Sequence, residues 1–107
     1  MSIRPSTYFI AVIEDISKSK IIAAATLIVE LKFVHDCGKV GHIEDVVVNS
    51  DYRAKNLGKR IIDHLKSIGA QQQCYKIILD CAEKNVAFYE KCGFVKKEFQ
   101  MRHDFAH

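Results

Sequence analysis

The stretch HIEDVVVNSDYRAKNLGKRIIDHL, residues 42–65, decides the fold. It begins with a β-branched run typical of a strand, continues through polar turn-forming residues, and ends in an amphipathic helical pattern. A loop that enters a helix N-terminus presents backbone N–H groups without helical partners, and the helix dipole favours negative charge there. The basic residues of this loop therefore predict a site for an anion, most simply a phosphate.

Composition limits the class of protein. The chain has 107 residues, 49% of them hydrophobic and 27% charged, which predicts one globular domain with a hydrophobic core. Its net charge of +3 suits binding of a small anion but falls short of the dense basic stripe of nucleic-acid binders. No segment is as long as the roughly 18 apolar residues of a membrane span, and the opening MSIRPSTYF does not resemble a signal peptide. We expect an intracellular, cytoplasmic protein with no nucleic-acid partner and no membrane span.

The cysteines carry little functional signal. Cys37, Cys74, Cys81 and Cys92 contain no C-x-x-C pair, so we expect reduced, buried thiols and no metal site.

The elements follow from apolar periodicity. Residues 6–15, 20–35 and 42–48 are rich in β-branched residues and predict three antiparallel strands, and apolar spacings of three and four from residue 57 predict a helix of about three turns. Residues 74–81 predict a central strand, 83–94 a second helix stopped by Gly93, and 99–105 a last strand. The order β-β-β-α-β-α-β predicts an α/β (α+β) fold with a mixed, mostly antiparallel twisted sheet flanked by helices.

Three blocks, residues 42–65, CYKIILDC (74–81) and EKNVAFYEKCGF (83–94), carry a family resemblance. In order and spacing, residues 8–101 resemble the GNAT superfamily of acetyl-CoA-dependent acetyltransferases, and within it the glucosamine 6-phosphate N-acetyltransferase family. The resemblance implies that residues 1–107 form a single GNAT domain lacking the family's usual N-terminal strand and two helices. It also implies acetyl transfer from acetyl-CoA to the 2-amino group of D-glucosamine 6-phosphate, for UDP-N-acetylglucosamine synthesis, in a homodimer with the active site near the interface.

The coenzyme loop of this superfamily has the pattern Q/R-x-x-G-x-G/A, which RAKNLG at residues 53–58 resembles. Asn56 stands at the first glycine, and asparagine tolerates left-handed backbone angles better than most residues. The alternative is a solvated basic helix start with no ligand. The resemblance assigns coenzyme binding to Val46, Val47, Val48, Arg53, Ala54, Lys55, Asn56, Leu57, Gly58, Lys59, Asn85 and Tyr89.

The resemblance assigns three catalytic roles. The Tyr89 hydroxyl would stabilise or protonate the coenzyme sulfur, which suits a phenol with a pKa near 10. The Val46 N–H would stabilise the oxyanion, and Asp80 would orient the amine or accept its proton. The alternatives are a core aromatic for Tyr89, a capping or salt-bridging acid for Asp80, and a helix cap for Asn85.

The acceptor pocket is also assigned by resemblance. Glu44 and Asp45 are adjacent, so in a regular strand they point to opposite faces and cannot form a carboxylate pair without a bulge. The family has an arginine two or three positions after the methionine of its last strand, whereas here Arg102 directly follows Met101 and Asp104 lies on the phosphate side. The expected acceptor residues are Lys32, His35, Glu44, Asp45, Tyr75, Lys76, Asp80 and Arg102.

Other functions remain open at this point. The resemblance implies direct attack in a ternary complex, whereas an acyl-enzyme would use Cys81 or Cys92, and neither has an adjacent histidine to lower the thiol pKa. A GNAT enzyme for another amine would keep the coenzyme blocks without needing Lys32, His35 and Lys76 together. A module that binds acetyl-CoA without catalysis is the third possibility.

Overall fold

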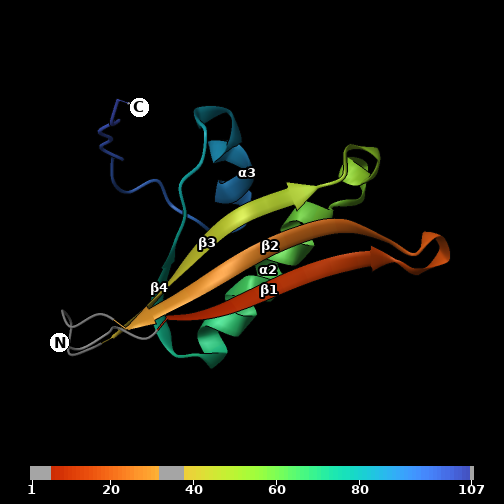
Figure 1. The fold of residues 1–107 in the computed structure, drawn as a ribbon, viewed down its shortest axis with the longest axis horizontal. Helices are drawn as coiled ribbons and strands as arrows, with labels where there is room; N and C mark the ends of the chain where they lie inside the picture. Colours follow the sequence, from red (N-terminus) through yellow and green to blue (C-terminus); the bar gives the residue numbers. More distant parts are fainter. Residues whose placement is uncertain (1–5, 32–37, 107) are drawn as a thin grey trace.

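The computed structural model describes residues 6–31 and 38–106, and it forms a four-stranded sheet with helices packed against it (Figure 1). The sheet order is β1-β2-β3-β4; the first three strands are antiparallel and β4 runs parallel to β3. The predicted fold class is confirmed. The elements are β1 (Ser6–Asp15), η1 (Ile16–Lys18), β2 (Lys20–Leu31), β3 (Lys39–Val48), η2 (Ser50–Lys55), α2 (Leu57–Gln71), β4 (Cys74–Ile78), η3 (Glu83–Asn85) and α3 (Val86–Lys91).

The core lies between the sheet and α2, which runs behind β1, β2 and β3 in Figure 1. Alternate residues of β2 face this helix, because side chains of a strand point to opposite faces with a period of two. The helix has 15 residues, about a turn longer than predicted. None of the helices in the described part of the chain is long and apolar enough to cross a membrane. The buried residues of these two elements include Ala23, Ala25, Leu27 and Val29 on β2 and Leu57, Ile61, Ile62 and Leu65 on α2.

A β-bulge interrupts β3 in the middle of the motif that decides the fold. The register passes from Thr26↔Glu44 to Ala24↔Val47, so Asp45 and Val46 together lie opposite one residue of β2. Asp45 has φ 56°, in the left-handed region, as the extra residue of a bulge often does. The strand is therefore not regular here, and the expectation that adjacent residues point to opposite faces does not apply at this position.

β3 and β4 stay together for only part of their length. Their pairing ends at His42↔Ile78, although β3 continues to Val48. The predicted strand 74–81 is correspondingly shorter, and the chain after Ile78 leaves the sheet toward α3. Two strands that part in this way leave space between them for a ligand and expose backbone groups along the edge of β3.

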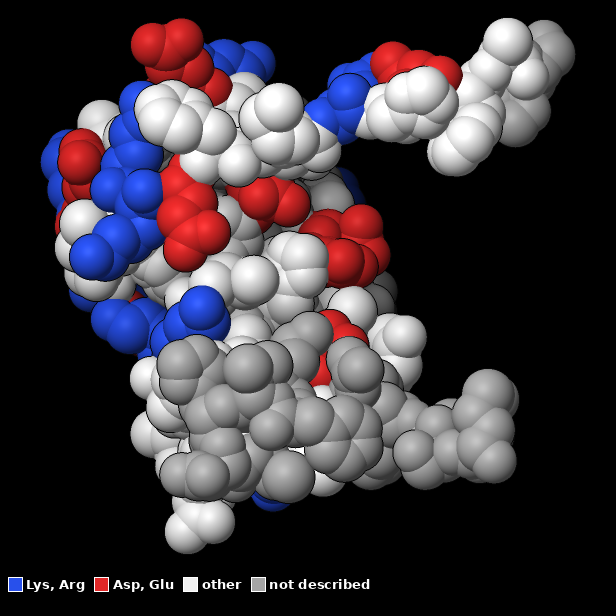
Figure 2. Space-filling model, turned by 90° about the vertical axis from the view of Figure 1, so that its left-hand side faces the viewer, with Lys and Arg blue, Asp and Glu red and all other residues white. Residues whose placement is uncertain are grey.

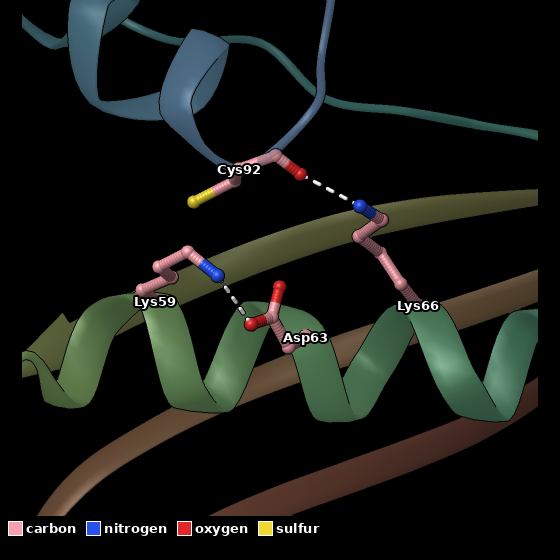
Figure 3. Close-up of polar contacts among 4 residues, drawn as sticks. All are labelled: Lys59, Asp63, Lys66 and Cys92. Carbon is pink, nitrogen blue, oxygen red and sulfur yellow. Dashed lines mark hydrogen bonds and ion pairs between the residues drawn. The ribbon is translucent and has the colours of Figure 1, made fainter.

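The last helix, α3, is tied to α2 at its C-terminal end (Figure 3). The Lys66 ammonium of α2 donates a 2.7 Å hydrogen bond to the carbonyl oxygen of Cys92. Gly93 has φ 93°, a backbone conformation that side chains rarely adopt, and its N–H bonds the carbonyl of Glu90. Gly93 is thus the predicted stop of this helix.

The predicted last strand, residues 99–105, is wrong. Residues 94–106 contain no strand and run away from the sheet at the upper left of Figure 1. Phe99 and Met101 are 86% and 90% exposed, so their alternation with polar residues is not matched by burial. A strand exists only where a neighbour completes its hydrogen bonds, and β4 has no further strand beside it among the described residues.

Candidate functional site

A cavity of about 240 Å³ lies where β3 and β4 part. Three parts of the chain meet there: the bulge of β3, the extended segment after β4, and the start of the last helical region. The bulge turns the chain between Glu44 and Val46, while the early end of β4 pairing leaves room opposite them. The lining residues are Ile43, Glu44, Asp45, Val46, Leu79, Asp80, Cys81, Ala82, Asn85 and Tyr89.

Six residues predicted to act on the coenzyme or the acceptor are brought together in this cavity: Glu44, Asp45, Val46, Asp80, Asn85 and Tyr89. They come from positions 44–89 of the sequence, so only the fold makes them neighbours. Asn85 occupies the N-cap position of α3, yet its side chain makes no capping hydrogen bond. The cap alternative for that residue is therefore not seen, and its amide remains available at the cavity.

Tyr89 is held in the cavity by other aromatic rings. Its ring packs edge-on against Phe88 at 5.0 Å and against Phe94 at 6.1 Å between ring centroids. Burial raises the pKa of the Tyr89 hydroxyl, and the neighbouring thiols Cys81 and Cys92 raise it further. The hydroxyl therefore carries its proton at neutral pH, and it can donate a hydrogen bond to a thiolate.

Acidic side chains line the cavity. In the face that Figure 2 shows, several Asp and Glu side chains lie toward the hollow at the right, whereas most Lys and Arg side chains lie at the left, with other acidic side chains among them. At the cavity, the ring of His42 lies between two carboxylates, with Nδ1 3.6 Å from Oε1 of Glu44 and Nε2 4.0 Å from Oδ2 of Asp80. Such a set of carboxylates attracts a protonated amine by charge.

The N-terminus of α2 has the features of an anion site. Asn56 precedes it in the left-handed conformation, with φ 61° and ψ 26°, as predicted for an asparagine at the glycine position of the loop. Its side chain does not cap the helix, and no acidic residue lies in the first turn. The first main-chain bond found here is from Arg60 N–H to the carbonyl of Asn56, 3.2 Å long. A helix that starts with cations and no cap is disfavoured by its own dipole, unless an anion binds there.

Gly58 links this helix start to the cavity. A Cβ atom at this position would lie 3.0 Å from Cζ of Phe88 and 3.8 Å from a methyl group of Val48. The backbone of α2 at Gly58 therefore closely approaches the ring of Phe88, the residue before Tyr89. Because the same glycine sits in the coenzyme motif, its small size serves the packing of α2, β3 and α3 around the site.

Other predicted acceptor residues do not reach the cavity. Tyr75 and Lys76 are exposed on β4, where the Lys76 ammonium lies 5.7 Å from the centroid of the Tyr75 ring. Arg102 lies in the exposed tail and donates from Nε to Asp104 at 2.8 Å. Lys32 and His35 fall outside the described residues, and the side chains of Arg53, Ala54 and Lys55 in η2 are likewise not described.

Sequence reasoning missed His42 and Phe88 as parts of the site, and it considered Cys81 only as a nucleophile of the acyl-enzyme alternative. His42 could have been found from strand periodicity, because it precedes Glu44 by two positions and so shares its face. Phe88 has only the sequence pattern of a core position, although its ring contacts both Tyr89 of the cavity and the start of α2 at Gly58.

The cysteines differ in exposure. Cys92 is buried and Cys74 partly buried, as expected, and burial raises the pKa of both thiols. Cys81 is exposed, which corrects the expectation of a buried thiol at that position. Among the described residues, no group of three or more His, Cys, Asp and Glu side chains is arranged to hold a metal ion.

A second hollow, of about 300 Å³, lies between the β1–β2 turn and η2. It is lined by Asp15, Lys18, Lys20, Asp51 and Tyr52. Two of these side chains already bond each other, since Tyr52 donates to Asp15 at 2.6 Å. None of the predicted catalytic residues lines this hollow, and the smaller cavity at β3 and β4 is therefore the better candidate for chemistry.

Comparison with known proteins shows the family of the chain. Residues 2–94 match the acetyltransferase (GNAT) family. Glucosamine 6-phosphate N-acetyltransferase 1 of Dictyostelium discoideum is 62% identical over 95 residues, covering 89% of this chain and 60% of that protein. The glucosamine 6-phosphate N-acetyltransferase of Schizosaccharomyces pombe is 42% identical over 97 residues, covering 91% of this chain and 87% of that protein.

A solved structure shares the fold. The crystal structure of glucosamine-6-phosphate N-acetyltransferase from Arabidopsis thaliana has a TM-score of 0.88 at 46% identity, and the match covers 92% of this chain and 67% of that one. The chain spans about 60% of the length of the Dictyostelium relative. Since the matched residues hold the parted strands, the bulge and the helix start described above, the chain belongs to the acetyltransferase (GNAT) family and is similar to its glucosamine 6-phosphate N-acetyltransferases.

Proposed function

We propose that this chain transfers acetyl from acetyl-CoA to the 2-amino group of D-glucosamine 6-phosphate, giving N-acetyl-D-glucosamine 6-phosphate and CoA. The observation that carries the proposal is the 62% identity to a protein named for this activity over 89% of the chain. The cavity adds support from chemistry, because it combines carboxylates suited to an amine with a protonated phenol suited to a leaving thiolate. The product feeds UDP-N-acetylglucosamine synthesis, in the cytoplasm.

Coenzyme binding follows from two features of the chain. The N–H groups and cations at the start of α2 bind the pyrophosphate of acetyl-CoA, as a helix end without a side-chain cap favours. From there the pantetheine runs along Val46, Val47 and Val48, on the edge of β3 that β4 leaves unpaired. The thioester then lies at the cavity beside Tyr89.

Acetyl transfer proceeds by direct attack in a ternary complex. The sugar ammonium first gives one proton to Asp80, and the neutral nitrogen then attacks the thioester carbonyl carbon. The Val46 N–H stabilises the oxyanion, and the carbon–sulfur bond breaks with its electron pair on sulfur. Tyr89 donates its proton to the thiolate, and the second proton that leaves the nitrogen as the amide forms restores the Tyr89 hydroxyl. Asp80 then releases the first proton to solvent. Free CoA thiol and one proton are released for each amide made.

The acidic side chains suit the amine but not the phosphate of the acceptor. A sugar phosphate needs cations, which lysine supplies as a point charge and arginine as a two-pronged donor. Lys32, His35, Tyr75, Lys76 and Arg102 are proposed for this role. Arg102 is carried on an exposed tail, so it reaches a phosphate only when the tail folds against a site, in its own chain or in a second copy.

A homodimer with the active sites near its interface fits the exposed apolar surface. Tyr8 and Ile10 on edge strand β1 are 64% and 73% exposed, and the tail adds Phe99 and Met101. An unpaired edge and an apolar tail of the same chain are both covered when two copies associate. Sedimentation should give a dimer at micromolar concentration, and a monomer there would contradict this part of the proposal.

The test of the function is release of free CoA thiol from acetyl-CoA, with glucosamine 6-phosphate and unphosphorylated glucosamine compared side by side. We expect strong turnover with the phosphorylated sugar alone, because the phosphate supplies binding energy that glucosamine lacks. Equal turnover with both sugars would contradict the proposed cationic pocket for the sugar phosphate. No turnover with either sugar, despite acetyl-CoA binding, would favour another amine acceptor or a binding module.

A further inference from the structure

His42 occupies an unusual place, between two carboxylates at the point where β3 and β4 part. Its Nδ1 lies 3.6 Å from Glu44 and its Nε2 lies 4.0 Å from Asp80. The His42 side chain is 26% exposed, against 43% for Glu44 and 65% for Asp80. The ring is therefore the least exposed of the three side chains, and both acids line the cavity.

The fold creates this arrangement through strand register. Glu44 follows His42 by two positions on β3, so both lie on one face. His42 is paired with Ile78 in the last pair between the two strands, and Asp80 follows that residue by two positions. Two carboxylates from different strands thus converge on one ring. Without a positive or hydrogen-bonding group between them, the two negative carboxylates would repel each other.

We propose that His42 is a positioning residue for the acceptor amine: it holds the carboxylates of Glu44 and Asp80 in the orientation that receives the amino group. This inference rests on the proposed function. Asp80 is exposed and Glu44 is partly exposed, and neither makes a direct hydrogen bond to another described side chain. Each would otherwise sample several rotamers, and a misplaced carboxylate costs rate because proton transfer needs hydrogen-bond reach.

The protonation state of the ring decides how many carboxylates it holds. A neutral imidazole has one N–H donor and can bond one acid, whereas the imidazolium has two donors and can bond both. The observed separations are longer than direct hydrogen bonds, and contacts of this kind tighten when substrate binds. Binding of the sugar amine between the acids is therefore expected to shorten both contacts to the ring.

Other charged groups lie on the face of the sheet that carries His42 and contribute to the charge around its ring. The register places Glu30 of β2 and Lys76 of β4 on the same row, paired through Val40, two positions along β3 from His42. These two residues have opposite charges and lie on either side of β3. Among the described residues, Glu44 and Asp80 remain the acids within ion-pair distance of the ring.

The test compares His42→Gln and His42→Ala with His64→Gln. His64 is an exposed histidine on α2, on the other side of the sheet, so it controls for loss of an imidazole. We expect His42→Ala to lower kcat/KM for glucosamine 6-phosphate about 100-fold, the cost of misplacing a reacting group by about an ångström. His42→Gln keeps a donor toward one acid and should recover part of this loss. KM for acetyl-CoA and the melting temperature should stay at the His64→Gln values.

A double-mutant cycle with Asp80→Asn shows whether His42 acts through Asp80. If it does, adding His42→Gln to Asp80→Asn causes little further loss, because the group being positioned is already gone. If the losses in kcat/KM of the two single variants instead multiply in the double variant, His42 acts independently of Asp80 and the proposal is wrong. Wild-type kcat/KM in His42→Ala would overturn it as well, as would an equal rise in KM for acetyl-CoA, which indicates a general structural defect.

Failure of the proposed function is recognised separately. If the wild-type protein does not acetylate glucosamine 6-phosphate, the proposed function is wrong. The contacts of the His42 ring with Glu44 and Asp80 can then still be tested by NMR. The His42 ring resonances should shift in Glu44→Gln and in Asp80→Asn, whereas those of His64 should not. If the His42 resonances are unchanged in both variants, the His42 ring does not contact the two carboxylates, and the proposed positioning role is wrong.

Discussion

The Tyr52 hydroxyl donates a 2.6 Å hydrogen bond to Oδ2 of Asp15, which joins η2, the turn before α2, to the β1–β2 turn. The Tyr52 ring is buried at the start of η2, while Asp15 also caps η1 by accepting from the Ser17 N–H at 3.1 Å. One carboxylate thus fixes two turns. η2, which leads into α2, is therefore held to the β1–β2 turn.

Tyr52→Phe tests this tie through its pH dependence. The hydrogen bond from Tyr52, and then that from Ser17, hold the pKa of Asp15 below its ordinary value of 3.8. A carboxylate whose folded pKa is depressed contributes stability above its unfolded pKa and loses it as pH falls through the folded pKa. Tyr52→Phe should therefore melt a few degrees lower at pH 7, with the difference shrinking below about pH 4. Thermal melts across pH check this, and a constant difference down to pH 2 would contradict it.

Tyr89→Phe tests the proton donor. The variant keeps the ring packed against Phe88 and Phe94 but lacks the hydroxyl, so kcat should fall about 100-fold with little change in acetyl-CoA affinity. Because burial raises the pKa of Tyr89 above 10, its proton is not lost in the working pH range. Turnover should thus show no Tyr89-dependent alkaline loss below about pH 10.

The matched control for this variant is Tyr8→Phe, which removes a hydroxyl from an exposed tyrosine of β1. It should leave kcat unchanged. Wild-type kcat in Tyr89→Phe, measured by thiol release at saturating acetyl-CoA, would remove Tyr89 from the mechanism. So would a rise in KM for acetyl-CoA at constant kcat, which would make the hydroxyl a coenzyme contact only.

The sequence was sufficient where structure follows from local periodicity. The β-branched and aromatic content of residues 6–15 and 20–35 predicts two strands, and β1 and β2 confirm them as far as Leu31, beyond which residues 32–35 are not described. The apolar spacings of three and four from residue 57 predict α2. Asn56 was predicted to accept the left-handed conformation, and it does. These outcomes depend on a residue and its neighbours in the chain.

Features that depend on distant partners were not predictable in the same way. The bulge at Asp45 brings Ile43, Val46 and Val48 to the core, with a spacing of three where a regular strand has two. The strand predicted at residues 99–105 is wrong for the opposite reason. FQMRHDF alternates like a strand, but no strand lies beside it among the described residues. His42 acquires its second acid only through register with β4.

Cys81→Ser and Cys92→Ser separate direct attack from an acyl-enzyme. Cys81 lines the cavity and is exposed, yet direct transfer does not use it, so Cys81→Ser should retain turnover. Cys92 is buried with a raised pKa, which disfavours its thiolate. Cys92→Ser puts a hydroxyl in an apolar site and should cost about 1–3 kcal/mol of stability without abolishing activity of the folded protein. Loss of turnover in Cys81→Ser, with acetyl-CoA still bound, would overturn direct attack.

Lys66→Met and Lys59→Met form a matched pair on one helix, with opposite expected effects (Figure 3). Lys66 joins α2 to the end of α3 by its bond to the Cys92 carbonyl, and its ammonium lies 5.8 Å from the centroid of the Phe94 ring. Lys66→Met should therefore lower the free energy of unfolding by about 1 kcal/mol, the usual worth of a hydrogen bond. Acetyl-CoA affinity should change little, because Lys66 lies in the second half of the helix.

Lys59, in contrast, stands in the first turn of α2 and pairs with Asp63 at 2.7 Å on the surface. Surface ion pairs add little stability, so Lys59→Met should melt near the wild-type temperature. Its charge lies at the proposed pyrophosphate site, and its loss should weaken acetyl-CoA binding about tenfold at low salt and less at high salt. Chemical denaturation and calorimetric titration measure the two quantities. Equal acetyl-CoA affinity in both variants would place the anion site elsewhere than the start of α2.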